Sequence, residues 1–261
     1  MHGLAREDLF TVVHDQVLTD TARYADVVLP ATTHFETDDL ASSYGSFMLQ
    51  PMPAVIERVG ESRSNNELAA ELARRLGYDL TRFSVEREEI VARSLKDDGT
   101  YTEPRATRPS EGTVQFRDTF PSFQDRRARL ASLPGLGVPR YVELDDPYPL
   151  TLITPATTKT INSMFGEFQP ADPAIHLHPD DSAARALADG ATVRVYNDRA
   201  SITTVVRVDS AIRPGVASMP KGTWCRDFVE GLTPNALVPA TLSDLADGAC
   251  FNDTRVEVVR S

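Results

Sequence analysis

The chain has 261 residues, 41% of them hydrophobic and 25% charged, which suffices for one large domain or two smaller domains with buried cores. A formal net charge of −11 argues against a nucleic-acid partner, because an acidic surface repels the phosphate backbone. Two cysteines are too few for an iron–sulfur cluster or a four-cysteine zinc site, and no apolar run of 18 residues predicts insertion in a membrane.

Two short apolar segments come first along the chain. Residues 9–14 (LFTVVH) and 26–30 (DVVLP) each predict a buried strand, because both are rich in β-branched residues. The stretch between them is long enough for one or two helical turns, so the order predicts a piece of parallel α/β sheet. Two parallel strands cannot cover their own faces, and we expect further chain or a partner to cover them.

A capped helix follows a loop that runs into a strand over residues 42–56. Ser64 and Glu67 form the capping-box pattern, and Gly77 marks the end of the helix. A weaker helix is predicted over about residues 85–95. The apolar face of the first helix repeats at Leu68, Leu72 and Leu76.

Prolines and glycines interrupt residues 97–147, which predicts an extended linker with a short strand near 113–116. We therefore divide the chain into an α/β segment (1–100), a linker (101–147) and a C-terminal domain (148–261).

The C-terminal domain is rich in predicted strands and holds one short predicted helix, 180–190, which stops at Gly190. This composition predicts a small β-barrel rather than a sandwich. The predicted strands are 149–156, 174–179, 192–197, 200–209, 215–220 and 254–260.

Self-contained catalytic motifs such as GxSxG, the P-loop, HExxH and GxGxxG do not occur in the sequence. His176 and His178 would share a face of a strand, which could hold a metal, but no carboxylate or cysteine pattern nearby completes a site, so the sequence favours a strand edge that faces solvent. Cys225, between Trp224 and Arg226, could have a lowered thiol pKa, or could be an ordinary half-buried thiol.

A dense set of polar side chains follows the strand at 149–153, in the sequence TPATTKTINSM. Its hydroxyls, amide and single cation, Lys159, could hold a phosphorylated ligand rich in heteroatoms, or could form a polar surface loop. Asn197 is typical of a hairpin turn, and Asn235 and the Asn252–Asp253 pair leave the same two interpretations open.

Taken together and in order, these segments resemble the molybdopterin oxidoreductase family, also called the dimethyl sulfoxide reductase family. The resemblance covers nearly the whole chain except the linker. In the first 100 residues it is carried by GLAREDLFTVVHDQVLTDTARYADVVLPATTHFE (3–36), SYGSFMLQ (43–50) and GESRSNNELAAELARRLG (60–77). In the C-terminal domain it is carried by PLTLITPATTKTINSMFG (149–166), by residues 175–220 and by NALVPATLSDLADGACFNDTRVEV (235–258).

The resemblance implies an α/β fragment followed by a mostly-β double-psi β-barrel, α+β overall. It implies a molybdenum or tungsten ion held by two molybdopterin guanine dinucleotides. Glu36 and the Ser43–Tyr44–Gly45 turn fall on motif positions near the cofactor channel, where they could instead serve packing. The implied cofactor contacts are Thr154, Thr157, Lys159, Asn162 and Ser163, followed by Asn197, Asn235, Asn252 and Asp253.

Two departures from the family pattern place alanine where glycine is usual, in Arg199–Ala200 and in Ala186–Leu187–Ala188. If either site needs a positive φ, alanine costs about 1 kcal/mol relative to glycine.

The resemblance also implies parts that this sequence does not contain, namely the side chain that ligates the metal and any iron–sulfur cluster. We therefore expect upstream domains, or a separate catalytic chain of the same enzyme, as partners, with a small-molecule substrate undergoing two-electron oxidation or reduction. No catalytic residue and no metal ligand is expected here. Because no basic start precedes an apolar stretch, we expect a cytoplasmic location. The alternatives are a non-catalytic accessory subunit or binding module that docks on a larger catalytic chain, and an unrelated double-psi barrel enzyme.

Overall fold

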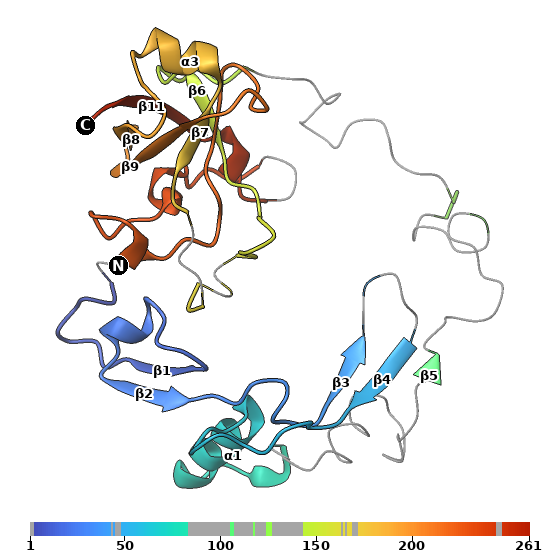
Figure 1. Ribbon diagram of the computed structural model, residues 1–261. Helices are drawn as coiled ribbons and strands as arrows, with labels where there is room; N and C mark the ends of the chain where they lie inside the picture. Colours follow the sequence, from blue (N-terminus) through green and yellow to red (C-terminus); the bar gives the residue numbers. More distant parts are fainter. Residues whose placement is uncertain are drawn as a thin grey trace. The chain divides into compact units, whose positions relative to one another are not determined.

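The computed structural model divides the chain into two compact units, Met1–Arg129 and Leu130–Ser261 (Figure 1). The helix predicted over about 85–95 and the strand predicted near 113–116 lie outside the described residues. Most of the predicted linker does too, so its limits stay a prediction. The structure describes residues 3–42, 44, 48–82, 105–106, 117, 124–126, 143–162, 164, 166–168, 172–243 and 247–261.

The N-terminal unit contains the predicted parallel pair of strands. Strand β1 (Val12–Asp15) lies parallel to β2 (Val27–Pro30), and the crossover between them holds the single turn η1 (Ala22–Tyr24). The prediction of a parallel pair is confirmed. The prediction that these strands are buried is wrong for this chain, because the side chains of Val12 and Val27 are 50% and 39% exposed. A two-stranded sheet has no second layer to cover either face.

A small antiparallel sheet follows in the same unit. Strands β3 (Asp39–Ser42) and β4 (Met48–Met52) form a hairpin, and β5 (Arg105–Ala106) pairs with the free edge of β4. The strand predicted within residues 42–56 is therefore present, and a partner strand begins just before it.

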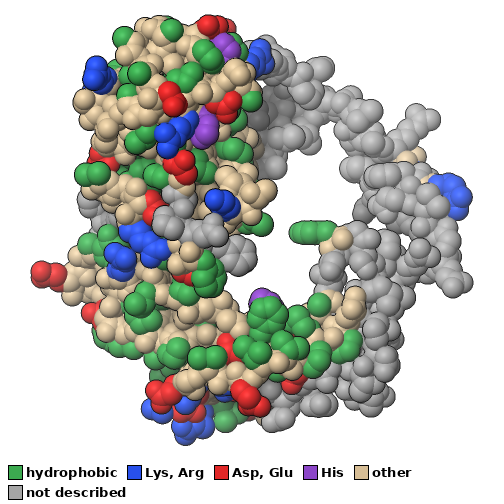
Figure 2. Space-filling view, viewed as in Figure 1, with side chains coloured by type: hydrophobic (Ala, Val, Ile, Leu, Met, Phe, Trp, Pro, Cys, Tyr) green, Lys and Arg blue, Asp and Glu red, His purple; other side chains and the backbone are tan. Residues whose placement is uncertain are grey.

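Helix α1 (Asn65–Arg75) has the capping box that the sequence predicts. The Ser64 hydroxyl accepts a hydrogen bond from the Glu67 amide at 3.2 Å, and the Glu67 carboxylate accepts one from the Ser64 amide at 2.7 Å. The chain leaves the helix through Gly77 and continues into η2 (Leu80–Arg82). The leucine face is largely uncovered, since Leu72 and Leu76 are exposed. Hydrophobic side chains are accordingly visible on the surface of this unit, in the lower half of Figure 2.

The C-terminal unit is a closed six-stranded barrel with the neighbour order β10-β6-β11-β8-β9-β7. Pairs β6–β10 and β7–β9 are parallel and the other pairs are antiparallel. All six predicted strands are confirmed within their predicted ranges. The strands are β6 (Leu150–Ile153), β7 (Ile175–Leu177), β8 (Thr192–Tyr196), β9 (Ser201–Val208), β10 (Val216–Ser218) and β11 (Arg255–Arg260).

The barrel core follows from the alternation of side chains along each strand. In β9, for example, Ile202, Thr204 and Val206 are buried while the residues between them are partly exposed. The same alternation in β8 and β11 places two valines of each strand in the interior. The strand side chains of this interior are Leu150, Leu152, Ile175, Leu177, Val193, Val195, Ile202, Val206, Ala217, Val256 and Val258.

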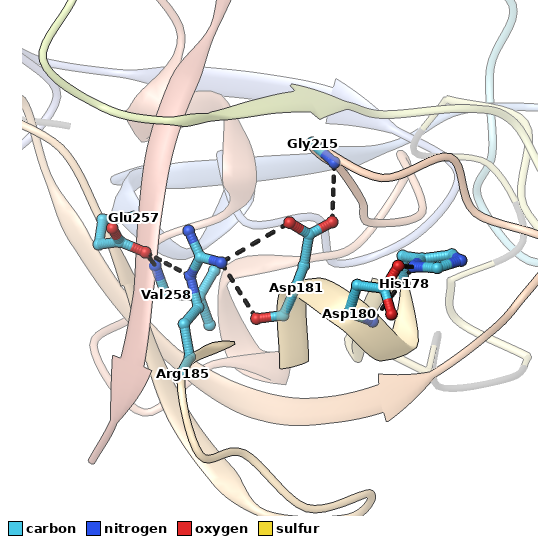
Figure 3. Close-up of polar contacts among 7 residues, drawn as sticks. All are labelled: His178, Asp180, Asp181, Arg185, Gly215, Glu257 and Val258. Atoms are coloured by element: carbon cyan, nitrogen blue, oxygen red, sulfur yellow. Dashed lines mark hydrogen bonds and ion pairs between the residues drawn. The ribbon is translucent and has the colours of Figure 1, made fainter. Parts of the chain in front are cut away.

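One end of the barrel carries α3 (Pro179–Ala184), which is shorter than the predicted helix 180–190. Polar contacts join it to the loop before β10 and to strand β11 (Figure 3). Asp181 accepts a hydrogen bond from the Gly215 amide at 2.7 Å, just before β10, and Arg185 donates to Glu257 of β11 at 2.6 Å. This ion-paired cluster anchors the helix at that end.

The two histidines have separate roles in this structure. His178 lies beyond β7 as the N-cap of α3, where its Nδ1 accepts a hydrogen bond from the Asp180 amide at 3.1 Å. His176 lies within β7, and its Nδ1 is 3.5 Å from a carboxylate oxygen of Asp209. Within the described part of the chain there is no group of three or more histidine, cysteine or acidic side chains placed to hold a metal ion. The described helices also include none with the length and apolar character needed to cross a bilayer.

Candidate functional site

Strand direction gathers the predicted contact residues at one end of the barrel. Strands β6, β8 and β10 finish at this end, and β7, β9 and β11 begin there, because each of the latter runs antiparallel to one of the former. The segment TPATTKTINSM (residues 154–164), here called the polar loop, begins at Thr154 directly after β6, and Asn197 follows β8. Asn252 and Asp253 lie in η5 (Phe251–Asp253), directly before β11. Since α3 follows the far end of β7, these residues lie opposite α3 (Figure 1).

Asn235 lies at the same end of the barrel, because the short segment that contains it is hydrogen-bonded to Asn197. It lies on η4 (Pro234–Leu237), whose Leu237 carbonyl accepts a hydrogen bond from the Asn197 side chain at 2.8 Å. The side chains of Asn235, Asn252 and Asp253 are exposed. The structure therefore brings together the described members of the predicted set, while Ser163 lies outside the described residues.

The polar loop is held in a compact turn by its own threonines. The Thr157 hydroxyl oxygen accepts hydrogen bonds from the amides of Lys159 and Thr160, at 3.2 and 3.0 Å. Thr160 is 2% exposed, whereas Thr157, Lys159 and Asn162 are exposed. Thr154, at the end of the strand, is half-buried. The Lys159 and Asn162 side chains of the loop are therefore exposed to solvent, whereas the Thr160 side chain is buried.

A second loop, after β10, packs against the polar loop. Its Lys221 amide donates to the Pro155 carbonyl at 3.0 Å, and its Lys221 carbonyl accepts from the Thr160 hydroxyl at 3.0 Å. Gly222 has a φ of +87°, and a β-carbon there would lie 1.6 Å from the Asn162 carbonyl oxygen. Only glycine fits this approach of two backbones.

The same loop contributes an arginine stacked on an aromatic ring. The Arg226 guanidinium lies 4.3 Å from the centroid of the Trp224 ring and donates a hydrogen bond to the Gly166 carbonyl at 2.6 Å. A β-carbon on Gly166 would lie 2.4 Å from Trp224 Nε1, so the chain passes directly over the indole. Cys225 begins the short turn η3 (Cys225–Asp227) between these two side chains and is half-buried, with its thiol outside any disulfide.

Sequence reasoning missed the second loop as part of the site. The available signal was KGTWCRD directly after a predicted strand, with cations and an aromatic side chain together. It becomes meaningful only because β10 pairs parallel to β6, which places the two loops side by side. Over residues 154–168 and 219–227 they carry Lys159, Lys221 and Arg226 against Glu167 and Asp227. The full connections to β7 and η4 add Asp172 and Glu230, so three cations stand against four carboxylates.

Both polar atoms of the Asn197 side-chain amide make hydrogen bonds. Its Oδ1 accepts hydrogen bonds from the amides of Arg199 and Ala200 at 3.0 and 3.3 Å. Its Nδ2 donates to the carbonyls of Leu237 and Arg255 at 2.8 and 3.0 Å. These bonds close the β8–β9 turn and tie it to two other segments, so in this structure Asn197 positions the end of the barrel. Its direct contact with a ligand stays a prediction.

Glu36 of the N-terminal unit is a packing residue. It is 8% exposed, and its two oxygens accept hydrogen bonds from the Thr33 amide and hydroxyl, the Val59 amide and the Ser62 hydroxyl, at 2.7 to 3.1 Å. The hydrogen bonds from the Val59 and Thr33 amides lower the pKa of Glu36 to about 2. All of its partners belong to the surrounding loops. Of the Ser43–Tyr44–Gly45 turn, only Tyr44 is described, and it is exposed.

The alanine departures have different backbone conformations. Ala186, directly after α3, has a φ of +52°, in the left-handed region that favours glycine. Ala200 is not among the described residues with positive φ, so alanine is unstrained in the β8–β9 turn.

Comparison with known families matches the two units separately. Residues 150–255 match the molydopterin dinucleotide binding domain, and residues 2–75 match molybdopterin oxidoreductase. The first range spans five of the six barrel strands and reaches the first residue of β11, and the second spans β1 to β4 and helix α1.

Curated relatives match most of the chain. The probable oxidoreductase YoaE of Bacillus subtilis is 31% identical over 98% of this chain and 41% of its own length. The dimethyl sulfoxide/trimethylamine N-oxide reductase of Rhodobacter capsulatus is 30% identical, with 82% of this chain and 32% of its own length covered. The chain thus spans about two fifths or less of the length of these relatives.

Among solved structures, acetylene hydratase from Pelobacter acetylenicus matches with a TM-score of 0.79 at 18% identity. The match covers 99% of this chain and 41% of that chain, and at this identity it establishes the fold alone. The comparisons give no support to a non-catalytic accessory module, and the match over residues 2–75 argues against an unrelated barrel enzyme.

Proposed function

We infer that the chain belongs to the molybdopterin oxidoreductase family, and we propose that it forms the C-terminal, dinucleotide-binding part of a molybdenum or tungsten enzyme. The proposed cofactor is a pair of molybdopterin guanine dinucleotides that hold the metal. We also propose that the barrel within residues 148–261 is of the double-psi class, which its two parallel strand pairs support. Residues 1–100 would form the C-terminal part of the adjoining α/β domain.

The observation that carries this proposal is the convergence of the polar segments on one end of the barrel. Four segments far apart in the sequence, 154–162, 197–200, 235–237 and 252–253, meet where β6, β8 and β10 end. The opposite end is occupied by α3 and its ion pairs. A ligand rich in hydroxyl, amide and phosphate groups therefore has one end of this barrel at which to bind.

The side chains at this end fit an anionic dinucleotide. Lys159 is exposed and has no carboxylate within ion-pairing distance among the described residues, so its ammonium is available to a phosphate. The Asn162 and Asn252 amides and the Thr154 hydroxyl offer neutral donors and acceptors for the guanine, sugar and pterin groups. When bound, the cofactor would supply the two-electron chemistry, and this chain would bind and orient it.

We propose that the remaining parts of the enzyme lie in the same polypeptide or in a separate catalytic chain. They would supply the side chain that ligates the metal, any iron–sulfur cluster and the access path for a small substrate. The exposed valines of β1 and β2 and the exposed leucines of α1 support a covering layer of protein, because parallel sheets are normally buried on both faces. No residue of this chain is assigned an acid–base role.

The test is cofactor analysis of the enzyme purified together with its remaining domains or partner chain. Metal analysis should find molybdenum or tungsten, and acid hydrolysis should release guanine nucleotide. A Lys159→Gln variant should retain roughly tenfold less cofactor after dialysis, because a charge-assisted hydrogen bond contributes about 1.5–3 kcal/mol. The matched control is Arg213→Gln, which removes one exposed cation from the loop before β10, at the α3 end. Absence of both metals and of guanine nucleotide from the wild-type enzyme would refute the proposal.

A further inference from the structure

The hydroxyl hydrogens of the polar loop can be assigned from the acceptors around them. The Thr160 hydroxyl has one hydrogen and lies 3.0 Å from the Lys221 carbonyl oxygen, which can only accept. The hydrogen of Thr160 is therefore used in that bond. The 2.9 Å contact between the hydroxyls of Thr157 and Thr160 then requires Thr157 to be the donor.

With this assignment, every hydrogen-bonding site of the Thr157 hydroxyl is occupied. Its hydrogen is donated to Thr160, and its oxygen accepts from the amides of Lys159 and Thr160. A hydroxyl has one donor and two acceptor sites, so none remains for a ligand. Thr157 is exposed and belongs to the predicted contact set, yet its bonds all go to its own loop.

We propose that Thr157 and Thr160 are positioning residues that form a hydroxyl relay from Thr157 through Thr160 to the Lys221 carbonyl. The relay fastens the loop after β6 to the loop after β10 and so presents Lys159 to an anionic ligand. The close approach of Gly222 to the Asn162 carbonyl fixes the two loops at a second point. This inference rests on the proposed function, because it assigns roles within the same cofactor-binding end.

The relay separates the predicted contact set into two kinds of residue. Lys159 and Asn162 remain candidates for direct contact, since their side chains are exposed. Thr157 changes from a contact to a support for the backbone that carries them. Loss of the Thr160 hydroxyl removes the only link between Thr157 and the second loop that the described hydrogen bonds provide.

The experiment measures amide hydrogen exchange in the full 261-residue chain, with GDP as the probe of anion binding by calorimetry. Thr160→Val and Thr157→Val keep the side-chain shape and remove the hydroxyl, while Thr160→Ser and Thr157→Ser restore it. We expect both valine variants to raise exchange of the Lys159 and Thr160 amides by about 5- to 30-fold and to weaken GDP binding. Both serine variants should restore protection and affinity. Lys159→Gln should weaken GDP binding and leave exchange unchanged.

A Thr157→Val variant that binds GDP poorly while the loop amides keep wild-type protection would overturn the inference, because Thr157 would then be a direct contact. Wild-type protection in Thr160→Val would overturn it as well. Unfolding followed by Trp224 fluorescence confirms that each variant is folded, and the exposed Thr157 provides a second variant if Thr160→Val does not fold. If the wild-type chain does not bind GDP, the proposed function is in doubt, and the exchange comparison of valine with serine still decides the relay.

Discussion

Replacement of Ala186 by glycine should stabilise the barrel, although it removes a side chain. Ala186 has a φ of +52°, and its methyl group is exposed, so little apolar burial is lost on removal. A left-handed conformation costs an L-residue roughly 1–2 kcal/mol, and glycine avoids that cost. Glycine also lowers the free energy of unfolding by about 0.5–1 kcal/mol, because it increases the conformational entropy of the unfolded chain. The net stabilisation expected for Ala186→Gly is therefore about 0.5–1 kcal/mol.

Urea unfolding followed by tryptophan fluorescence measures this change directly as a free energy. The chain has one tryptophan, Trp224, which is 4% exposed and lies in the loop after β10. With a denaturant dependence of about 2 kcal/mol per molar urea, the midpoint should rise by roughly 0.3–0.5 M at unchanged slope. The hydrogen bond from the Ala186 amide to the Ala183 carbonyl, at 3.0 Å, is kept in the variant.

Ala200→Gly is the matched control, because it changes the other alanine that departs from the family pattern. Ala200 is partly buried against the core and is not among the described residues with positive φ. Glycine there should lower stability by about 0.5–1 kcal/mol. Two results would show that the backbone conformation of Ala186 does not reduce the free energy of unfolding. One is a urea midpoint that falls or stays constant in Ala186→Gly, and the other is a shift of both variants in the same direction.

Three further outcomes follow from individual contacts. Asn197→Asp should lower the free energy of unfolding in urea by about 1–3 kcal/mol, because a carboxylate cannot donate hydrogen bonds to the carbonyls of Leu237 and Arg255. The control Asn235→Asp changes an exposed side chain and should stay within about 0.5 kcal/mol of wild type. Equal losses in the two variants would contradict this reasoning. The pKa of Glu36 is lowered from 4.5 to about 2, so its contribution to stability is complete above pH 4.5 and is lost as the pH falls toward 2. Amide exchange in the N-terminal unit should therefore rise across this interval in the wild type and change less in Glu36→Gln; identical pH profiles would exclude the carboxylate as the cause. Ser64→Ala should cost helix α1 about 1 kcal/mol, seen as faster exchange of its first-turn amides, and unaltered exchange would show that the cap has no role.

Local patterns predicted most elements of both units. The alternation of apolar residues predicted the six barrel strands, because side chains on a strand point alternately to its two faces. The spacing of Ser64 and Glu67 predicted the start of α1, because the capping box involves only neighbouring residues. The parallel pairing of β1 with β2 was also predicted, since a short crossover leaves few other arrangements.

The burial of elements could not be predicted in the same way. Val12 and Val27 have the composition of a buried sheet and are half-exposed here, because burial depends on what packs above and below the strands. The same holds for the leucine face of α1, since Leu72 and Leu76 are 50% and 70% exposed.

Residue identity and local pattern were enough to find the polar and cationic side chains of the candidate site, namely its threonines, its asparagines and Lys159, and the segments that form strands. Three observations came only from the folded chain: these residues share one end of a barrel, the loop holding Gly222 packs against the loop after β6, and the hydroxyls of Thr157 and Thr160 lie 2.9 Å apart. The physical reason is the range of the interactions. Side-chain alternation and helix capping act between neighbours in the chain, whereas the parallel pairing of β6 with β10 joins residues more than sixty positions apart.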